Sequence, residues 1–520
     1  METEVLIVGA GPTGLMLASQ LARRGVRALI IDRHSGPAQQ TRAMAVQART
    51  LEIYSKLGIA DRALALGERG TGANMWANGR WTARIPIGDI GKSLSPFPFI
   101  LMLGQDDNER IMGEKLAELG VAVQWNTELT AFTQHSDHVE AVIKTDNGNA
   151  RRVRASWLAG CDGARSAVRE LSGITFPGAP YEHVFFVADT EATGSMKQGE
   201  LNVYLWRDGF HLFFPMRGKN RWRVIGVLPK AMRSRSDLAF DELVPELRQE
   251  AGSTLTFKQC SWFSTYRIHH RAAERFRDRR CFLLGDAAHV HSPMGAQGMN
   301  TGLQDAYNLA WKLALVVQGR ADAALLDTYE EERMPVAQRL LRTTDRAFQL
   351  VVSEGWLGRL FRTRILARFA ARAMRLERVR QLAFRTISQI GIRYRSARLS
   401  QTLDGLPETS PRAGDRFPWL KDLFERLDDA RFNLLVVGQP APAAEALGVG
   451  ELCAVHEVEY AASATELGRA GIAGPAFYLL RPDGYVGLAG RRLDADGLKR
   501  YLAQRHFLIG AGGVKSVTRL

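Results

Sequence analysis

The chain has 520 residues, 46% hydrophobic and 24% charged, a composition typical of globular proteins and long enough for two or three domains. It holds no run of 18 apolar residues, which excludes a conventional transmembrane helix, and its acidic start does not resemble a secretory signal. The four cysteines are scattered without a CxxC pair, which argues against a disulfide framework and a structural zinc site, so we expect a cytoplasmic protein.

The net charge of +14 is concentrated in one segment. Residues 356–399 hold twelve arginines, no lysine and a single acid, Glu377, so this segment alone contributes +11. That distribution argues against a broad nucleic-acid-binding face. Within 364–376 the apolar and arginine side chains occupy opposite sides of an expected helix. The pattern predicts a docked surface helix, and contact of 356–395 with a membrane surface is the alternative.

The N-terminal residues predict a βαβ unit. Residues 4–10 and 26–32 are short apolar runs typical of buried strands, and 11–24 has helical periodicity between them. Further elements are expected as helices at 46–57 and 106–119 and as strands at 121–125 and 138–145.

The pattern changes after residue 175. Alternating runs such as LNVYLW and WRVIGVL within 176–270 predict an antiparallel sheet inserted into the first unit. Helices are then expected at 303–317 and 323–348, followed by a mainly helical stretch. Residues 410–420 look like a linker into a third unit with strands at 432–438 and 476–490 and a closing helix at 494–505. The expected division is 1–175 with 271–350, then 176–270, 351–405 and 406–520.

The first motif is GAGPTG, placed between an expected strand and helix as a dinucleotide loop requires. Gly9 allows a tight turn, Gly11 lets the backbone approach a pyrophosphate, and Gly14 allows close packing of helix and strand. Asp32 ends the next strand, where an acid can accept a ribose hydroxyl. The motif predicts dinucleotide binding but does not separate NAD from FAD.

The stretch FLLGDAAHVHSPMGAQGMNTGLQDAYNLAWKL, at 282–313, allows three interpretations. His289 and His291 have no evident third ligand nearby, so we expect no metal site there, and the GK[ST] signature of a phosphate loop is missing. A flavin cradle fits better. Asp286 follows an apolar strand and could bind a ribityl chain, and a helix starting near Asn300 offers backbone N–H groups to a reduced flavin.

GAGPTG, CDGARSAVRE at 161–170 and the 282–313 stretch together resemble the three fingerprints of group A flavoprotein aromatic hydroxylases, the p-hydroxybenzoate hydroxylase and phenol hydroxylase superfamily. The resemblance covers about 1–350. The C-terminal third, with SPRAGDRFPWL and LLRPDGYVG, is similar to the thioredoxin-like domain of larger members such as pentachlorophenol and polyketide hydroxylases. The implied fold is α/β, with a Rossmann-like FAD-binding domain, an inserted antiparallel-sheet substrate domain and a thioredoxin-like C-terminal domain.

The resemblance also implies roles for individual residues. Residues of the first motif and Asp32 would hold the ADP half of FAD, Arg42 would lie near the pyrophosphate, and Gln105 near the ribityl chain. Asp162 is associated with both FAD and the reduced nicotinamide, although a surface ion pair for Arg42 and a turn acid for Asp162 are the structural alternatives. The implied cofactor-binding set is Gly9, Gly11, Gly14, Asp32, Arg33, Arg42, Gln105, Asp162, Gly285, Asp286, Pro293, Gly295, Gly298, Met299 and Asn300; the candidate catalytic residues are Pro293 and Arg267.

The implied activity is hydroxylation of a phenolic or polycyclic aromatic compound with NAD(P)H and O₂, through a flavin C4a-hydroperoxide. The partners would be a small aromatic substrate and O₂, without nucleic acid or an integral membrane segment, and a homodimer is allowed. Aromatic residues of 176–270 are expected mostly as sheet core, with a wide aromatic pocket as a hypothesis. The alternatives are a related flavoprotein with halogenase-like or reductase chemistry, or a non-catalytic flavin-dependent drug-binding protein.

Overall fold

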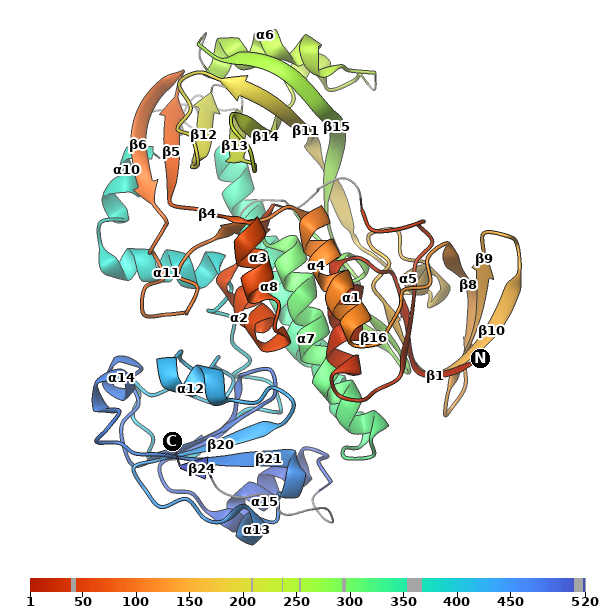
Figure 1. Cartoon of the computed structure of the whole chain (residues 1–520), viewed down its shortest axis with the longest axis vertical. Coiled ribbons are helices and arrows are strands. Elements are labelled where there is room, and N and C mark those ends of the chain that lie inside the picture. Colours follow the sequence, from red (N-terminus) through yellow and green to blue (C-terminus); the bar gives the residue numbers. More distant parts are fainter. Residues whose placement is uncertain are drawn as a thin grey trace.

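The computed structural model describes residues 1–38, 44–206, 209–235, 237–251, 254–291, 296–352, 367–508 and 518–519. Three larger sheets organise the described residues: one in the N-terminal unit, an eight-stranded sheet above it, and one in the C-terminal unit below it (Figure 1). A fourth, three-stranded sheet consists of β3 (Ala45–Val46), β7 (Leu101–Met102) and β4 (Glu68–Arg69). Among the described residues no helix combines the length and the apolar character needed to span a membrane.

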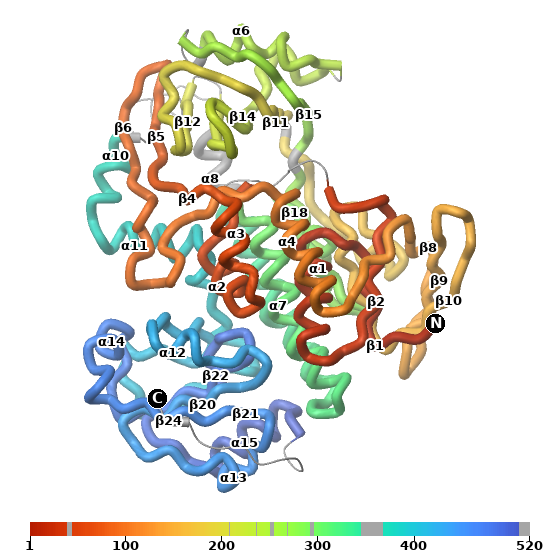
Figure 2. The backbone as a smooth tube through the Cα atoms, in the orientation of Figure 1, coloured from red at the N-terminus to blue at the C-terminus, as the bar shows by residue number. Residues whose placement is uncertain are grey.

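The N-terminal unit contains the expected βαβ arrangement. Strand β1 (Glu2–Val8) pairs in parallel with β2 (Ala28–Ile31) and β10 (Ala150–Gly160), and β10 pairs in parallel with β17 (Cys281–Leu283). Helix α1 (Pro12–Ala22) connects β1 to β2 and packs beside α7 (Gly298–Val317) and α4 (Gln105–Glu118), as Figure 2 shows. Smaller elements complete the unit: α2 (Ala48–Leu57), α3 (Ala60–Leu66), β8 (Thr127–Gln134), β9 (Val139–Thr145), α5 (Ala167–Leu171) and β16 (Arg277–Asp278).

The strand expected at 121–125 is wrong. Only Gln124 forms a bridge, to Ile31 at the end of β2, and the chain then turns at Asn126, whose φ is +51°. The apolar run VAV follows the end of α4 and packs against the core. Val121 and Val123 contact the buried cluster but pair with no neighbouring strand.

The second sheet has the strand order β18-β15-β11-β14-β13-β12-β5-β6. Its bounds are β11 (Gly178–Thr193), β12 (Leu201–Trp206), β13 (Gly209–Pro215), β14 (Arg221–Val227), β15 (Thr256–Ala272), β18 (His289–Val290), β5 (Gly72–Ala77) and β6 (Arg80–Pro86). The sheet therefore extends beyond 176–270, since β5 pairs in parallel with β12. Helix α6 (Phe240–Ala251) packs on one face of this sheet, and the other face is turned toward the N-terminal unit (Figure 1).

After α8 (Asp327–Val352), the chain carries α10 (Ala367–Ala373) and α11 (Glu377–Ile387); residues 353–366 lie outside the described part. Helix α10 packs on β6, and Ala371 contacts the apolar cluster behind that strand. Phe369 and Leu376 are nevertheless exposed, at 68% and 62%. The segment is therefore docked along one side, and contact of its outer side with a membrane surface stays a prediction.

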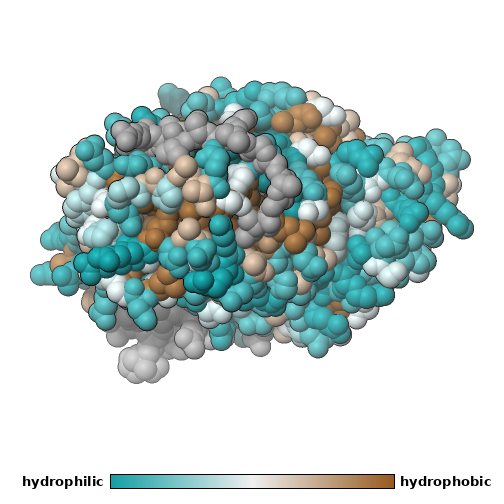
Figure 3. Space-filling model, turned by 90° about the horizontal axis from the view of Figure 1, so that it is seen from below, coloured by the Kyte–Doolittle hydropathy of each residue, from teal (hydrophilic) through white to brown (hydrophobic). Residues whose placement is uncertain are grey.

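The C-terminal unit holds a sheet of order β19-β23-β22-β20-β21-β24. Strand β20 (Phe432–Val437) is parallel to β21 (Cys453–Val458) and antiparallel to β22 (Ala476–Leu480), which is antiparallel to β23 (Val486–Gly490). The remaining elements are β19 (Gln401–Thr402), α12 (Lys421–Arg426), α13 (Ala444–Leu447), α14 (Ala464–Arg469), α15 (Ala495–Gln504) and β24 (Thr518–Arg519). The face at this end of the molecule is mostly hydrophilic, with hydrophobic patches between polar side chains (Figure 3).

Candidate active site

The glycine loop between β1 and α1 contains two glycines in crowded positions and one that borders open space. A Cβ at Gly9, where φ is +104°, would lie 2.3 Å from the carbonyl oxygen of Cys161, and a Cβ at Gly14 would lie 1.9 Å from the carbonyl oxygen of Gly9. A Cβ at Gly11 would meet nothing within 4 Å. Chain packing therefore requires glycine at the first and third positions, whereas Gly11 borders open space at the amino end of α1.

Asp32 connects this loop to the end of β2. Its carboxylate accepts a hydrogen bond from the backbone N–H of Ala10 at 2.7 Å and another from that of His34 at 2.9 Å. The side chain stays 12% exposed, so it borders the loop without being enclosed. The neighbouring Arg33 is exposed, and Arg42 lies outside the described residues.

The second motif lies directly beside the first, because Gly9 abuts the backbone of Cys161 and Asp162. Asp162 accepts hydrogen bonds from Ser166 Oγ at 2.5 Å and from the N–H of Val168 at 3.2 Å. Burial raises the pKa of this carboxyl group. Asp162 thus accepts hydrogen bonds from the start of α5, which fits the alternative of a turn acid. It also lies beside the glycine loop.

The third motif meets the first around Thr13. Cβ atoms at Gly285 and Gly302 would lie 2.6 Å and 2.5 Å from Thr13 Oγ1, so the turn containing Asp286 and the first turns of α1 and α7 converge there. Asp286 is exposed within the 3₁₀ turn Gly285–Ala287. Pro293 and Gly295 fall outside the described residues, whereas Gly298 and Met299 begin α7 and are half-buried.

Asn300 holds the amino end of α7 in place. Its side-chain oxygen accepts hydrogen bonds from the N–H of Gln47 at 2.9 Å and from Thr50 Oγ1 at 2.7 Å, and its amide donates to the carbonyls of Ala45 and Ala296, both at 2.9 Å. The side chain is therefore fully used within the protein. The N-cap residue of α7, Gln297, makes no side-chain cap hydrogen bond, so it leaves backbone N–H groups of the first turn to other acceptors.

Gln105 lies at the start of α4, one turn before Asn108, whose side-chain amide lies 3.4 Å from Sδ of Met299 in α7. Its amide donates to Glu109 Oε1 at 2.7 Å, and the other carboxylate oxygen of Glu109 accepts the N–H of Ala38 at 2.9 Å. Burial raises the pKa of Glu109. This pair joins α4 to the loop after β2, which also carries Asp32.

The residues present fit FAD. Two helices, α1 and α7, converge with amino ends whose N-cap residues, Gly11 and Gln297, make no side-chain cap hydrogen bond, and Gly11 leaves room for a phosphate at one of them. A family model described as FAD binding domain matches residues 2–344. The chain belongs to this family.

Two named monooxygenases match along most of the chain. The 6-methylpretetramide 4-monooxygenase of Streptomyces rimosus is 35% identical and covers 97% of this chain and 94% of its own. Pentachlorophenol 4-monooxygenase of Sphingobium chlorophenolicum is 32% identical, covering 86% and 81%. A crystal structure of aklavinone-11 hydroxylase with FAD and aklavinone superposes with a TM-score of 0.80 at 27% identity, covering 97% and 99%. The enzyme is an FAD-dependent aromatic monooxygenase that takes NAD(P)H as cosubstrate.

His289 belongs to a buried network with Asp305 and Arg333. His289 Nε2 lies 2.7 Å from Asp305 Oδ2, which also accepts the N–H of Gly285 at 3.1 Å. Arg333 Nε donates to the other oxygen of Asp305 at 2.6 Å. Burial favours the neutral form of Asp305, but Arg333 and His289 outweigh it and lower the pKa of that carboxyl. The sequence singled out His289 but not its partners, Asp305 and Arg333. Their only sequence signal is a charged residue within an apolar helical pattern.

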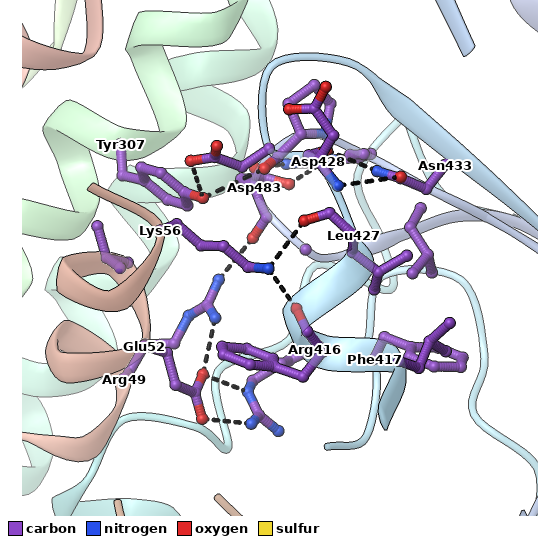
Figure 4. A pocket seen from close by; sticks show the side chains of 18 of the residues that line it. Arg49, Glu52, Lys56, Tyr307, Arg416, Phe417, Leu427, Asp428, Asn433 and Asp483 are labelled. Atoms are coloured by element: carbon purple, nitrogen blue, oxygen red, sulfur yellow. Dashed lines mark hydrogen bonds and ion pairs between the residues drawn. The ribbon is translucent and has the colours of Figure 1, made fainter. Parts of the chain in front are cut away.

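Sequence reasoning also missed the buried charges between the N-terminal and C-terminal units. Glu332 accepts hydrogen bonds from Arg481 and from Lys312 Nζ, the latter at 2.8 Å, and Asp483 pairs with Arg481. All four side chains are essentially inaccessible to solvent. Nearby, Arg49 and Arg416 both contact Glu52, and Lys56 donates to the carbonyl of Leu427 at 2.8 Å (Figure 4). The C-terminal unit is therefore attached to α2 and α8 by ionic contacts, and to α7 by hydrogen bonds from Asn308 and Trp311 to Asp483.

The other candidate catalytic residue, Arg267, lies on β15, whose end pairs with β18 in the third motif. Arg267 is exposed, whereas Tyr266 is half-buried and its ring centroid lies 6.0 Å from that of Phe185. Burial raises the pKa of Tyr266 to about 12. Phe186, Tyr204 and Phe213 pack on the α6 side of the sheet instead, so aromatic residues that looked equivalent in the sequence divide between two faces.

Proposed function

We propose that this monooxygenase hydroxylates a polycyclic aromatic substrate of the polyketide type, held between the flavin and the sheet face turned toward the N-terminal unit. The observation that carries the proposal is the division of the aromatic side chains. Phe185, Phe210 and Tyr266 lie on the face opposite α6, in one apolar cluster. The names of the relatives support it, because 6-methylpretetramide and aklavinone are the compounds that two of those proteins are named for.

We propose that the glycine loop and Asp32 bind the ADP half of FAD. Gly11 gives a phosphate access to the backbone amides of α1, and the dipole of α1 favours the negative charge. Asp32 would accept a ribose hydroxyl, with Arg33 and Arg42 near the phosphates. Gln105, Asp162 and Asp286 would face the ribityl and pyrophosphate groups of FAD. Gly285 would let the turn that carries Asp286 approach the ribityl group closely.

We propose that Pro293, Gly295 and the amides of Gly298, Met299 and Asn300 surround the flavin ring. FAD, once reduced by NAD(P)H, supplies the oxygen atom taken from O₂. The first turn of α7 would stabilise negative charge on the ring through its backbone N–H groups. Arg267 pairs with Val184, which packs on the α6 side of the sheet, so Tyr266 rather than Arg267 would orient the substrate from β15. The phenol of Tyr266 stays protonated at neutral pH, so it can donate a hydrogen bond. The surrounding apolar side chains exclude water from the reaction.

We propose the domain division 1–175 with 271–350 for FAD, 176–270 with the added strands β5 and β6 for substrate, 351–405 as a connection, and 406–520 as a thioredoxin-like unit. The order β23-β22-β20-β21, with one parallel and two antiparallel pairings and helices between the strands, supports the last assignment. The C-terminal unit lacks a CxxC pair, so its role is packing rather than thiol exchange.

The test is a substrate screen with the purified holoenzyme. NADPH and NADH oxidation is measured with monocyclic phenols and with anthracycline- and tetracycline-type polycyclic phenols, and products are identified by mass spectrometry. We expect polycyclic phenols to accelerate flavin reduction and to gain one oxygen atom, with ¹⁸O from ¹⁸O₂. Coupled hydroxylation of monocyclic phenols alone would contradict the substrate class, and reduction without any oxygenated product would favour a different flavin chemistry.

A further inference from the structure

We infer that the turn between β8 and β9 is a binding site for a divalent transition metal ion, formed by His135, His138 and Glu140. The turn is closed by a hydrogen bond from the N–H of His135 to the carbonyl of His138, at 2.8 Å. One ligand atom of each of the three side chains lies within 4.8 Å of the other two. The turn sits at the outer edge of the N-terminal unit, away from the eight-stranded sheet and the C-terminal unit (Figure 1).

The carboxylate of Glu140 faces both imidazoles. Its two oxygens lie 3.7 Å from Nε2 of His138 and 3.9 Å from Nε2 of His135. The two rings are stacked, with centroids 4.4 Å apart and planes inclined by 11°. Both Nε2 atoms therefore lie on the side of the turn where the carboxylate is.

Asp137 fixes the tautomer of His138. Its Oδ1 lies 2.7 Å from His138 Nδ1, so Nδ1 carries the proton and Nε2 keeps the lone pair that a metal needs. A carboxylate that accepts the second N–H of a ligand histidine is the usual outer partner in zinc sites. Arg154 contacts Asp137 Oδ2 at 3.2 Å, on the Nδ1 side of the ring. The guanidinium thus balances Asp137 and leaves the charge of Glu140 for the metal.

The set of ligands selects the class of metal. Two imidazole nitrogens and one carboxylate oxygen suit Zn²⁺, Ni²⁺ or Cu²⁺ and leave a fourth position for water. Metal–ligand bonds of about 2.1 Å in a tetrahedral site place the ligand atoms roughly 3.4 Å apart. The three side chains must therefore move closer together by small rotations. His135 and Glu140 are 42% and 51% exposed, so they can rotate without disturbing the core.

The experiment titrates Zn²⁺ into FAD-loaded enzyme from which any affinity tag has been removed, with binding followed by calorimetry. We expect one ion per chain, at least tenfold weaker binding in His138→Ala and Glu140→Gln, and about 10- to 100-fold weaker binding in Asp137→Asn. Glu128→Gln, which removes an exposed acid from β8 outside the turn, is the matched control and should bind as the parent does.

A second readout uses Cu²⁺ and electron paramagnetic resonance. We expect nitrogen hyperfine coupling from two imidazoles in the parent and from one in His138→Ala. Equal Zn²⁺ affinity in the parent and both ligand variants, or fewer than one ion per chain in the parent, would overturn the proposal. FAD content and hydroxylation should be unchanged in Glu140→Gln, so the result is independent of the substrate screen.

Discussion

Replacement of Gly11 by alanine should separate cofactor binding from folding. The new Cβ would meet no protein atom within 4 Å, and the backbone angles at this position, φ −71° and ψ −176°, suit alanine. The free energy of unfolding of the apoenzyme should therefore fall by at most about 1 kcal/mol, from the weaker N-cap. If the methyl group displaces a phosphate from one backbone amide, a charge-assisted hydrogen bond of about 1.5–3 kcal/mol is lost. FAD should then bind roughly 10- to 150-fold more weakly.

The assay measures apoenzyme unfolding in urea and FAD binding by the quenching of flavin fluorescence. Two matched variants bracket the result. Gly113→Ala, in α4 with open space around its Cβ, should gain about 1 kcal/mol of stability without a change in FAD affinity. Gly14→Ala, whose Cβ would lie 1.9 Å from the carbonyl oxygen of Gly9, should fail to fold. Parent-like FAD affinity in a folded Gly11→Ala enzyme would refute the assignment of this loop to the pyrophosphate.

Three further predictions concern buried charges and the substrate side. Asp305→Asn leaves Arg333 without a counter-charge and should lower the free energy of unfolding by about 3–5 kcal/mol in urea titration, and a loss below 1 kcal/mol would contradict the network. Burial lowers the pKa of Lys312 to about 8, so the unfolded state binds more protons above that pH, and stability should rise between pH 8 and 10.5; Lys312→Met should remove that rise. Tyr266→Phe should release more H₂O₂ per NAD(P)H while FAD content stays constant, and unchanged coupling would remove Tyr266 from the substrate site.

Local patterns predicted much of the N-terminal unit. The β1–α1–β2 segment, α4, α7 and the strands β20, β22 and β23 appear where apolar periodicity placed them, because each buries a regular apolar stripe or run. Strand β21 was not predicted. Residues 121–125 had the same apolar character without becoming a strand, since only Gln124 finds a partner. The addition of β5 and β6 to the second sheet was beyond local reasoning, because the partner strand β12 follows more than a hundred residues later.

The candidate site was likewise predictable only in part. The glycines were predictable because motif spacing reports backbone geometry, and contacts at Gly9, Gly285 and Gly302 confirm that the three motifs meet. The partners of His289 were not predictable, since Asp305 and Arg333 lie 28 residues apart and resemble ordinary helix-surface charges in the sequence. Burial, which only the fold reveals, turns them into a network.

That network gives the C-terminal unit a physical connection to the flavin region. Glu332 contacts Arg481 of the C-terminal unit, and the next residue of α8, Arg333, donates to Asp305 of α7 and to the carbonyl of Thr301 at 3.1 Å. Asp305 in turn binds the N–H of Gly285. A shift of the C-terminal unit would therefore pull on both ends of the third motif. Since removal of one partner of a buried ion pair costs about 3–5 kcal/mol, these contacts oppose such a shift, so a unit without redox thiols can serve the flavin site by holding α7 and α8 in position.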